Sequence, residues 1–176
     1  GRKYGLVGQE TVGVGGFAKA LRTIPVALNI AQLILEEAPD AMLLNFTNPA
    51  GLITQALKSH APAVKSIGLC NVPWNTRIEI AGALNVSASA VEFDYVGLNH
   101  LSWIRGIKVD GFDRSPEAIS AFRGLTINKA NPGDSPAWIQ STIDYLEAIP
   151  NYYLLYYYEE KAWVNYQLNN PTRASE

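Results

Sequence analysis

The sequence contains very few of the residues that usually carry disulfide or metal chemistry. Its 176 residues include one cysteine, Cys70, and two histidines, His60 and His100. A single cysteine cannot form a disulfide within the chain, which fits a reducing compartment. Because thiol and imidazole groups are so scarce, the places of Cys70 and His100 in the sequence become informative.

Other absences exclude whole classes of protein. No run of about 18 apolar residues is present, so the sequence predicts no transmembrane helix. The first ten residues, GRKYGLVGQE, lack the apolar core of a signal peptide. The net charge is −2 and the basic residues are scattered, which argues against a nucleic-acid surface. We therefore expect neither a membrane nor a nucleic acid among the partners.

The chain does contain the patterns of an α/β protein, and 48% of its residues are hydrophobic. Apolar residues spaced by three and four predict a helix over 16–37, with a kink or two abutting helices at Pro25. Short apolar runs at 41–46 and 65–69 predict buried strands. A helix follows each strand, the second at 73–84, and this alternation predicts a parallel sheet.

The later part of the chain has a different pattern. Residues 91–99 and 102–111 alternate between apolar and polar, which predicts two strands paired around a tight connection. From 138 to 168 the sequence predicts helices, interrupted at 149–151. A second, mixed region of helices and strands is therefore expected after the parallel sheet.

Polar residues follow three of the predicted strands. Asn48, Cys70 and His100 all lie where a strand ends, and ligands of open α/β sheets bind beyond those ends. A thiolate with an imidazole suits a divalent transition metal and leaves positions open for substrate oxygens. Each residue alone also has an ordinary explanation: a small buried thiol, a hydrogen-bonded imidazole, and an N-cap before Pro49. Only their joint arrangement favours a site.

Five motifs occur in a fixed order: GQETVGVGGFAKALRTIP, NFTNPAG, GLCNVP, GLNH and IPNYYLLYYY. Together they resemble glycoside hydrolase family 4, in particular its 6-phospho-β-glucosidase branch, which is NAD-dependent. The resemblance implies a partial Rossmann-like parallel sheet, the remainder of an NAD-binding domain, at 1–72. It implies that 73–176 begins a mixed α+β substrate and metal domain of the lactate/malate-dehydrogenase type.

The same resemblance implies that the family's dinucleotide fingerprint and its C-terminal part lie outside this chain. We therefore expect an internal piece of a longer protein. A phosphate-binding loop at a helix N-terminus is the main source of dinucleotide affinity, so we expect the chain alone to bind NAD poorly.

The family implies hydrolysis of 6-phospho-β-glucosides by an unusual route. NAD takes a hydride from sugar C3, and a tyrosine base then removes the acidified C2 proton. A divalent metal, most commonly manganese, holds the C2 and C3 oxygens while the glycosidic oxygen leaves by elimination. Water adds to the product, and NADH returns its hydride.

The resemblance also implies roles for individual residues. Cys70 and His100 match the metal ligands, and Tyr153 matches the catalytic base. Glu10 matches the acidic residue that increases the basicity of this tyrosine. Asn48 and Arg173 match substrate-binding residues, and Arg173 is expected to bind the phosphate because a guanidinium pairs well with it.

Three further residues are expected around the same site. Asn71 follows Cys70 where α-specific members have aspartate, and it is expected to touch the substrate. An amide cannot donate a proton as a carboxylic acid can, so Asn71 favours a β-linked substrate, either a phosphorylated disaccharide or an aryl 6-phospho-β-glucoside. Asn45 and Thr47 are expected to contact NAD. The resemblance further implies a homo-oligomer, a dimer or tetramer, in the cytoplasm.

A phenol with an ordinary pKa of about 10 is a weak base at neutral pH. A bound metal cation would lower the pKa of Tyr153, whereas a nearby Glu10 carboxylate would raise it unless it accepts the phenol proton. The sequence does not decide between these effects.

Two other functions fit parts of the pattern. A 2-hydroxy-acid dehydrogenase of the lactate/malate type has a similar architecture and an Asn-Pro turn, but it requires a histidine–aspartate pair and no metal. Cys70 with His100 argues against it. A non-catalytic or oligomerisation fragment is the other alternative, with the tyrosine-rich segment 152–158 as an interface.

Overall fold

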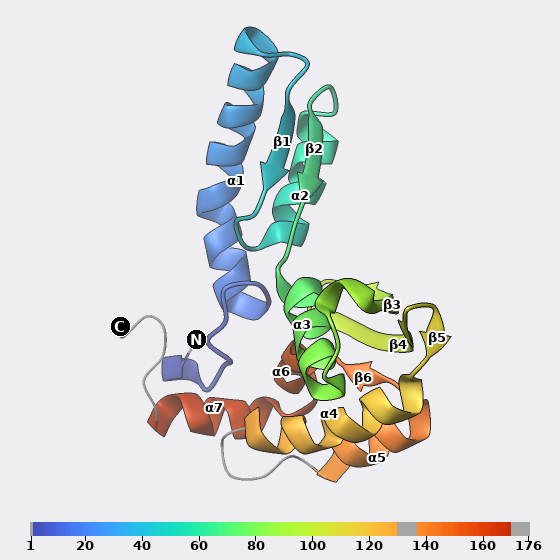
Figure 1. Cartoon of the computed structure of the whole chain (residues 1–176). Helices are drawn as coiled ribbons and strands as arrows, with labels where there is room; N and C mark the ends of the chain where they lie inside the picture. Colours follow the sequence, from blue (N-terminus) through green and yellow to red (C-terminus); the bar gives the residue numbers. More distant parts are fainter. Residues whose placement is uncertain (1, 130–136, 170–176) are drawn as a thin grey trace. The chain divides into compact units, whose positions relative to one another are not determined.

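The computed structural model describes residues 2–129 and 137–169 (Figure 1). The chain divides into two compact units. The first contains the residues up to Cys70 together with those from Gln167 onward, and the second runs from Asn71 to Tyr166. Each unit has its own sheet, two-stranded in the first and four-stranded in the second.

The first unit begins with the short helix η1 (Arg2–Tyr4) and continues with α1 (Gly13–Glu37), β1 (Met42–Asn45), α2 (Ala50–His60) and β2 (Lys65–Gly68). β1 and β2 pair in parallel over their whole length, which confirms the predicted parallel sheet. α1 is one helix of 25 residues that contains Pro25, so the predicted pair of abutting helices is wrong. A proline removes one backbone hydrogen bond, and the remaining turns of so long a helix tolerate that loss.

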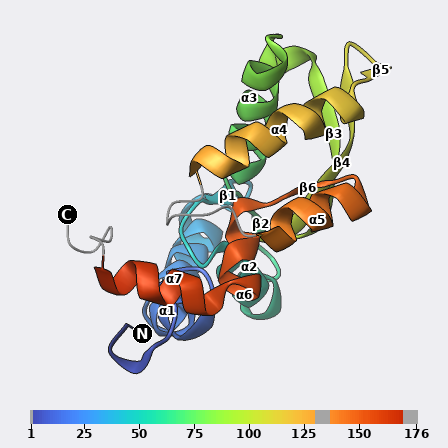
Figure 2. The same ribbon diagram turned by 90° about the horizontal axis from the view of Figure 1, so that it is seen from below.

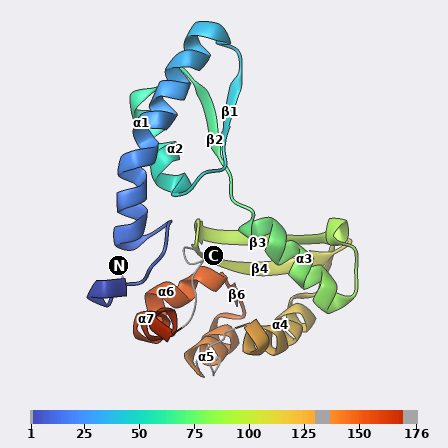
Figure 3. The ribbon, with the colours of Figure 1, turned by 90° about the vertical axis from the view of Figure 1, so that its left-hand side faces the viewer.

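The core of the first unit lies between the two helices and one face of the strands. Ala31, Ile53, Leu57 and Val64 are buried, and partly buried side chains of α1, β1 and the end of α2 surround them. Figure 3 shows α1 and α2 on the same side of β1 and β2. Burial of this apolar face is the main contribution to the stability of the unit.

The other face of this small sheet is open. Met42, Leu44 and Phe46 are 60%, 60% and 62% exposed, and Ile67 on β2 is 46% exposed. The prediction of fully buried strands is therefore wrong for the described residues. Side chains of a strand alternate between two faces, and only one face of this sheet is covered by helices.

By length and composition alone, α1 is apolar enough to cross a membrane. A core helix of a folded domain passes the same test. α1 carries Lys19 and Arg22 in its first half, and it buries Ala20 and Ala31 within the unit. α1 packs against α2 through one part of its surface, while Phe17, Leu21 and Val26 are 61%, 61% and 58% exposed.

The second unit contains a β-hairpin surrounded by helices. Its elements are α3 (Val72–Leu84), η2 (Ala88–Ala90), β3 (Val91–Leu98), β4 (Leu101–Val109), β5 (Phe112–Asp113), α4 (Ser115–Lys129), α5 (Ala137–Leu146), β6 (Ile149–Pro150), η3 (Tyr152–Leu154), α6 (Leu155–Tyr158) and α7 (Glu160–Asn169), whose last residues belong to the first unit.

β3 and β4 pair antiparallel with Leu98 opposite Leu101, so Asn99 and His100 alone form the turn. This confirms the predicted tight connection. β5 and β6 pair with the other edge of β4, and α3 and α4 pack beside the hairpin (Figure 2). The mixed α+β character expected for this part of the chain is confirmed.

The burial of α2 gives a test of the first unit. We expect Leu57→Ala, which truncates a side chain that is 1% exposed, to lower the local free energy of unfolding by about 2–5 kcal/mol. The measurement is amide hydrogen exchange of peptides covering β1, α2 and β2.

The matched control is Leu52→Ala on the same helix, because Leu52 is 47% exposed. A surface truncation of this kind should change the free energy by about 0.5 kcal/mol or less. Equal acceleration of exchange in both variants would contradict the proposed core.

Candidate active site

The loop that carries Glu10 packs directly on the first turn of α1. A Cβ atom at Gly15 would lie 2.2 Å from the carbonyl oxygen of Gln9, and one at Gly16 would lie 2.7 Å from the carbonyl carbon of Thr11. Such distances leave no room for a Cβ atom. The backbone of the loop can therefore approach the first turn of α1 this closely only because both residues are glycine. The glycine-rich motif thus fixes where the Glu10 backbone lies.

Gln167 holds the same loop from another part of the first unit. The Gly8 N–H donates to Gln167 Oε1 and Gln167 Nε2 donates to the Gly8 carbonyl oxygen, both at 2.8 Å. The Gln167 side chain is 8% exposed. A buried amide that satisfies both backbone groups of one residue acts as an anchor for the loop.

Glu10 and Asn48, predicted to act in one site, are in direct contact. Asn48 Nδ2 donates to Glu10 Oε1 at 3.1 Å, and the other carboxylate oxygen of Glu10 pairs with the Lys19 ammonium. The predicted N-cap role of Asn48 is wrong: α2 begins at Ala50, Pro49 occupies the N-cap position, and no side chain caps it. Instead, the Asn48 amide binds Glu10.

Lys19 was not anticipated from the sequence. It lies in the second turn of α1, where a lysine is ordinarily a solvated surface residue, and its place inside the motif GQETVGVGGFAKALRTIP did not indicate a role for it. Its ammonium offsets the charge of Glu10, although both side chains are substantially exposed and such pairs contribute little to stability. Its significance is therefore the orientation of the Glu10 carboxylate.

Asn45 and Thr47, the predicted NAD contacts, form one turn after β1. The Asn45 amide donates to the Thr47 carbonyl oxygen and accepts from the Thr47 N–H, both at 3.3 Å. Asn45 is 8% exposed, whereas Thr47 is exposed. The Asn45 side chain therefore shapes the turn, and the Thr47 side chain faces outward.

Cys70 and Asn71 lie on either side of the boundary between the units. Cys70 is a reduced, partly buried cysteine two residues beyond β2. Asn71 is the N-cap residue of α3, where its carbonyl oxygen accepts from the Asn75 N–H at 2.9 Å. Its side chain does not cap the helix.

His100 occupies an unusual position for a side chain of its size. Its φ is +64°, in the left-handed region, and it is only 3% exposed. The hairpin is also tight at Gly97, where a Cβ would lie 2.4 Å from the Leu101 carbonyl oxygen. A buried residue in this backbone region is uncommon, and such residues concentrate at functional sites.

The His100 imidazole stacks on the Tyr153 ring. The ring centroids are 3.7 Å apart and the planes are inclined by 14°. The predicted metal ligand and the predicted base, from distant parts of the sequence, are thus in contact. Aromatic neighbours Tyr152 and Tyr156 touch Tyr153, and Trp163 touches both of them.

Two nearby phenols are poorly suited to act as bases. Partial burial, and then the neighbouring phenols of Tyr153 and Tyr166, raise the pKa of Tyr152. Burial also raises the pKa of Tyr157. A phenol with a raised pKa is deprotonated less often at neutral pH, so less phenolate is available to accept a proton.

The structure brings the predicted site residues into two groups, Glu10 with Asn48 in the first unit and His100 with Tyr153 in the second. Arg173 lies outside the described residues. Within 2–129 and 137–169, no three His, Cys, Asp or Glu side chains cluster as a metal site.

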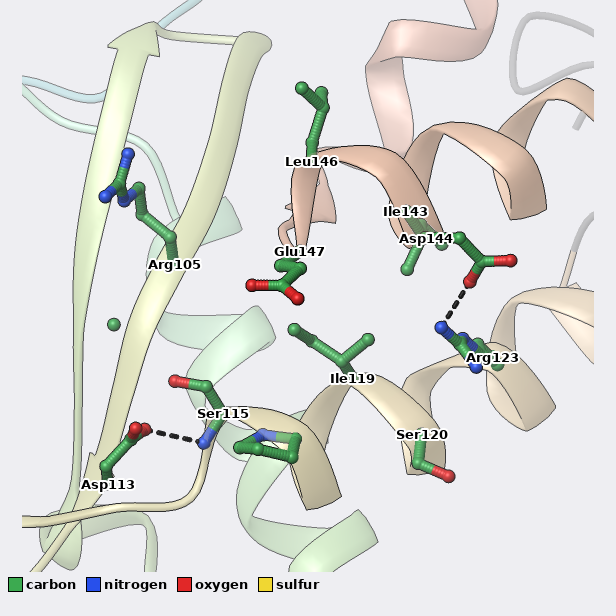
Figure 4. Close-up of a pocket in the computed structure, with 12 residues that line it drawn as sticks. Arg105, Asp113, Ser115, Ile119, Ser120, Arg123, Ile143, Asp144, Leu146 and Glu147 are labelled. Atoms are coloured by element: carbon green, nitrogen blue, oxygen red, sulfur yellow. Dashed lines mark hydrogen bonds and ion pairs between the residues drawn. The ribbon is translucent and has the colours of Figure 1, made fainter.

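A separate pocket of about 490 Å³ lies among β4, α4 and α5 (Figure 4). None of the predicted site residues lines it. Arg123 pairs with Asp144, and the Ser115 N–H donates to Asp113 Oδ1 at 2.9 Å, while Arg105 and Glu147 also line the pocket. Hydrogen bonds from Ser115 lower the pKa of Asp113.

Comparison with known families gives two matches that follow each other along the chain. The model of the family 4 glycosyl hydrolases matches residues 1–86. The model of the family 4 glycosyl hydrolase C-terminal domain matches residues 95–176. The boundary between them falls after α3, whereas the compact units divide before this helix.

Curated relatives agree with this assignment. A probable 6-phospho-beta-glucosidase of Bacillus subtilis is 39% identical over 170 residues, which are 94% of this chain and 38% of the relative. The 6-phospho-beta-glucosidase of Thermotoga maritima is 38% identical over 174 residues, 99% of this chain and 41% of the relative. The chain thus spans about two-fifths of the length of these relatives.

Solved structures give the same result for the fold. The 6-phospho-beta glucosidase from Thermotoga maritima with NAD and glucose-6-phosphate has a TM-score of 0.84 and 37% identity, over 98% of this chain and 40% of that one. A form with manganese, NAD+ and glucose-6-phosphate also has a TM-score of 0.84, at 37% identity over 98% of this chain and 41% of that one. From its consecutive motifs, its two matched family models and this shared fold, the chain belongs to the family 4 glycosyl hydrolases.

Proposed function

We propose that this chain carries the proton-abstracting and metal-binding part of a 6-phospho-β-glucosidase that uses NAD and manganese. The observation that carries the proposal is the stacked contact of His100 with Tyr153, 3.7 Å between centroids. It joins an imidazole suited to a metal and a phenol suited to proton transfer. The relatives named 6-phospho-beta-glucosidase, at 36–39% identity, give the substrate class.

In this proposal Tyr153 takes the proton from C2 of the sugar, and Glu10 assists it. Asn48 binds a sugar hydroxyl while its amide remains held by Glu10, and Lys19 keeps the Glu10 carboxylate oriented. Arg173 binds the sugar phosphate. When bound, NAD accepts and returns a hydride at C3, and manganese polarises the neighbouring sugar oxygens.

Cys70 and His100 would hold the metal. The fit rests on their chemistry, because a thiolate and an imidazole nitrogen both ligate divalent metals, and on the fixed backbone and stacked ring of His100. A thiolate also suits softer ions than manganese. Manganese itself is supported by the related structure that contains it.

Asn45 and Thr47 would hold NAD at their turn, where the Thr47 side chain is exposed. We accordingly assign 1–72 to the remainder of an NAD-binding domain and 73–176 to the start of the substrate and metal domain.

A phosphorylated sugar and a reduced thiol both suit the cytoplasm. The homo-oligomer implied by the family stays a prediction.

Asn71 supports a β-linked substrate, either a phosphorylated disaccharide or an aryl 6-phospho-β-glucoside. Relatives named for β-linked substrates are 36–39% identical, whereas full-coverage relatives named for α-linked phosphoglucosides are 29–31% identical. Membership of the glycosidase family disfavours the 2-hydroxy-acid dehydrogenase that the Asn-Pro turn also allowed.

Metal binding is the first test. We expect the reduced chain to bind about one Mn²⁺ by calorimetry and to lose that binding in both Cys70→Ser and His100→Ala, since each removes one of two ligands. His60→Ala is the matched control and should bind as the unsubstituted chain does, because His60 is an exposed imidazole at the end of α2. Binding that is indifferent to both ligand substitutions would refute the metal assignment.

Proton abstraction can be tested without NAD. A 3-keto glucose 6-phosphate already has an acidic C2 proton, so we expect the chain with Mn²⁺ to exchange it for solvent deuterium. Tyr153→Phe should slow this exchange by about 10²–10⁴-fold, the usual contribution of a general base. The measurement is loss of the C2 proton signal by NMR.

Tyr145→Phe is the control for this exchange, because Tyr145 is a phenol of the same unit that is 87% exposed. Its rate should equal that of the unsubstituted chain. Exchange that survives in Tyr153→Phe would exclude Tyr153 as the base.

A further inference from the structure

Asn151 lies at the junction of the two segments that carry His100 and Tyr153. It follows β6 directly and precedes η3, the short helix that contains Tyr153. It is 3% exposed. A buried amide has to satisfy several hydrogen-bonding atoms within the protein, so its partners show what it holds.

The Asn151 side chain makes three hydrogen bonds. Asn151 Oδ1 accepts from the Tyr153 N–H at 3.0 Å. Its Nδ2 donates to Tyr95 Oη at 2.8 Å and to Ser102 Oγ at 3.1 Å. One amide thus connects the backbone of Tyr153 with side chains of both strands of the hairpin.

Its backbone is engaged as well. The Asn151 N–H donates to the Ser102 carbonyl oxygen at 3.0 Å, which extends the pairing of β6 with β4 by one residue. The Leu154 N–H donates to the Asn151 carbonyl oxygen at 2.9 Å and closes the turn of η3. Asn151 therefore ends the strand and begins the helix.

The partners lie close to His100 in the sequence. Ser102 is two residues after His100 on β4 and is fully buried. Tyr95 lies on β3, opposite Ile104. The hydrogen bonds of Asn151 thus tie the strand that leaves the His100 turn to the turn that carries Tyr153.

We propose that Asn151 is the positioning residue that keeps the Tyr153 ring stacked on the His100 imidazole. This rests on the proposed function of Tyr153 as the base. Asn151 does not touch the reacting atoms. It fixes the η3 backbone relative to β4, and the stacked ring follows because Tyr153 is attached to that backbone.

The NMR signals of His60 and His100 allow the stacking of the Tyr153 ring on the His100 imidazole to be measured directly. In the NMR spectrum of the metal-free chain at one fixed pH, each imidazole gives one Hε1 signal, and His60→Gln identifies them. The ring current of Tyr153 should shift the His100 signal upfield of the exposed His60 signal. We expect Asn151→Ala to lose most of this upfield offset.

Two variants separate positioning from general stability. Asn151→Asp retains an oxygen acceptor for the Tyr153 N–H, so the offset should be largely restored. Ser115→Ala removes a hydrogen bond of comparable length elsewhere in the same unit, from the Ile107 N–H to Ser115 Oγ at 3.0 Å. It should leave the offset unchanged even if it lowers the melting temperature.

An unchanged offset in Asn151→Ala would overturn the proposal. If that variant does not fold, Tyr95→Phe carries the test, because it removes one accepting hydroxyl and retains the ring. We expect a partial loss of the offset in Tyr95→Phe. An offset equal to that of the unsubstituted chain would overturn the proposal.

The C2 exchange reaction supplies a kinetic readout. A displacement of about 1 Å in a reacting group costs about 10²-fold in rate. We therefore expect Asn151→Ala to lower the maximal exchange rate by about that factor, with little change in the half-saturating ketone concentration. Absence of exchange in the unsubstituted chain would count against the proposed function, while the NMR offset would still decide the role of Asn151.

Discussion

The second unit is organised around the stacking of an imidazole on a phenol ring. His100 projects from a two-residue turn, and Tyr153 projects from a single turn of helix far along the chain. Their contact requires β6 to pair with β4 in the observed register, so that the turn at Asn151 brings Tyr153 to the end of the hairpin. Stacked aromatic rings attract each other only weakly, by about 0.5–1.5 kcal/mol. The hydrogen bonds of Asn151 to Tyr95, Ser102 and the Tyr153 N–H must therefore help to hold this geometry.

The first unit places its polar residues by different means. The loop of Glu10 is fixed by backbone contacts against Gly15 and Gly16 and by the double hydrogen bond of Gln167. The Glu10 carboxylate then connects Asn48 to Lys19 in a partly exposed network. An exposed network of this kind adds little stability and leaves its groups accessible to a ligand. The first unit thus has a partly exposed network, whereas His100 in the second unit is only 3% exposed.

Much of the fold followed from local patterns in the sequence. The parallel pair β1 and β2, the hairpin turn at Asn99 and His100, and the helices between them were all predicted from hydrophobic periodicity and turn residues. The burial of β1 was predicted wrongly, because an apolar run does not reveal whether both faces of its sheet are covered. Asn48 was assigned as a helix cap, since its alternative partner Glu10 is remote in sequence.

The candidate site was predictable only in part, for the same reason. The order of the motifs identified His100 and Tyr153 through a family resemblance, and the structure places these two rings in contact. Lys19 and Asn151 lie within the quoted motifs, but neither composition nor spacing indicated what they contact. Their significance comes from partners brought near by the fold, and a hydrogen bond between distant segments leaves no periodic trace in a single sequence.

The left-handed backbone of His100 also limits how this position can change in evolution. Besides glycine, mainly asparagine, aspartate and histidine tolerate a positive φ, and of these only aspartate and histidine ligate metals well. A cysteine would offer a ligand and disfavour the turn, whereas an asparagine would keep the turn and weaken the ligand. Under the proposed metal role, position 100 must both adopt a positive φ and provide a metal ligand. Very few amino acids meet both requirements.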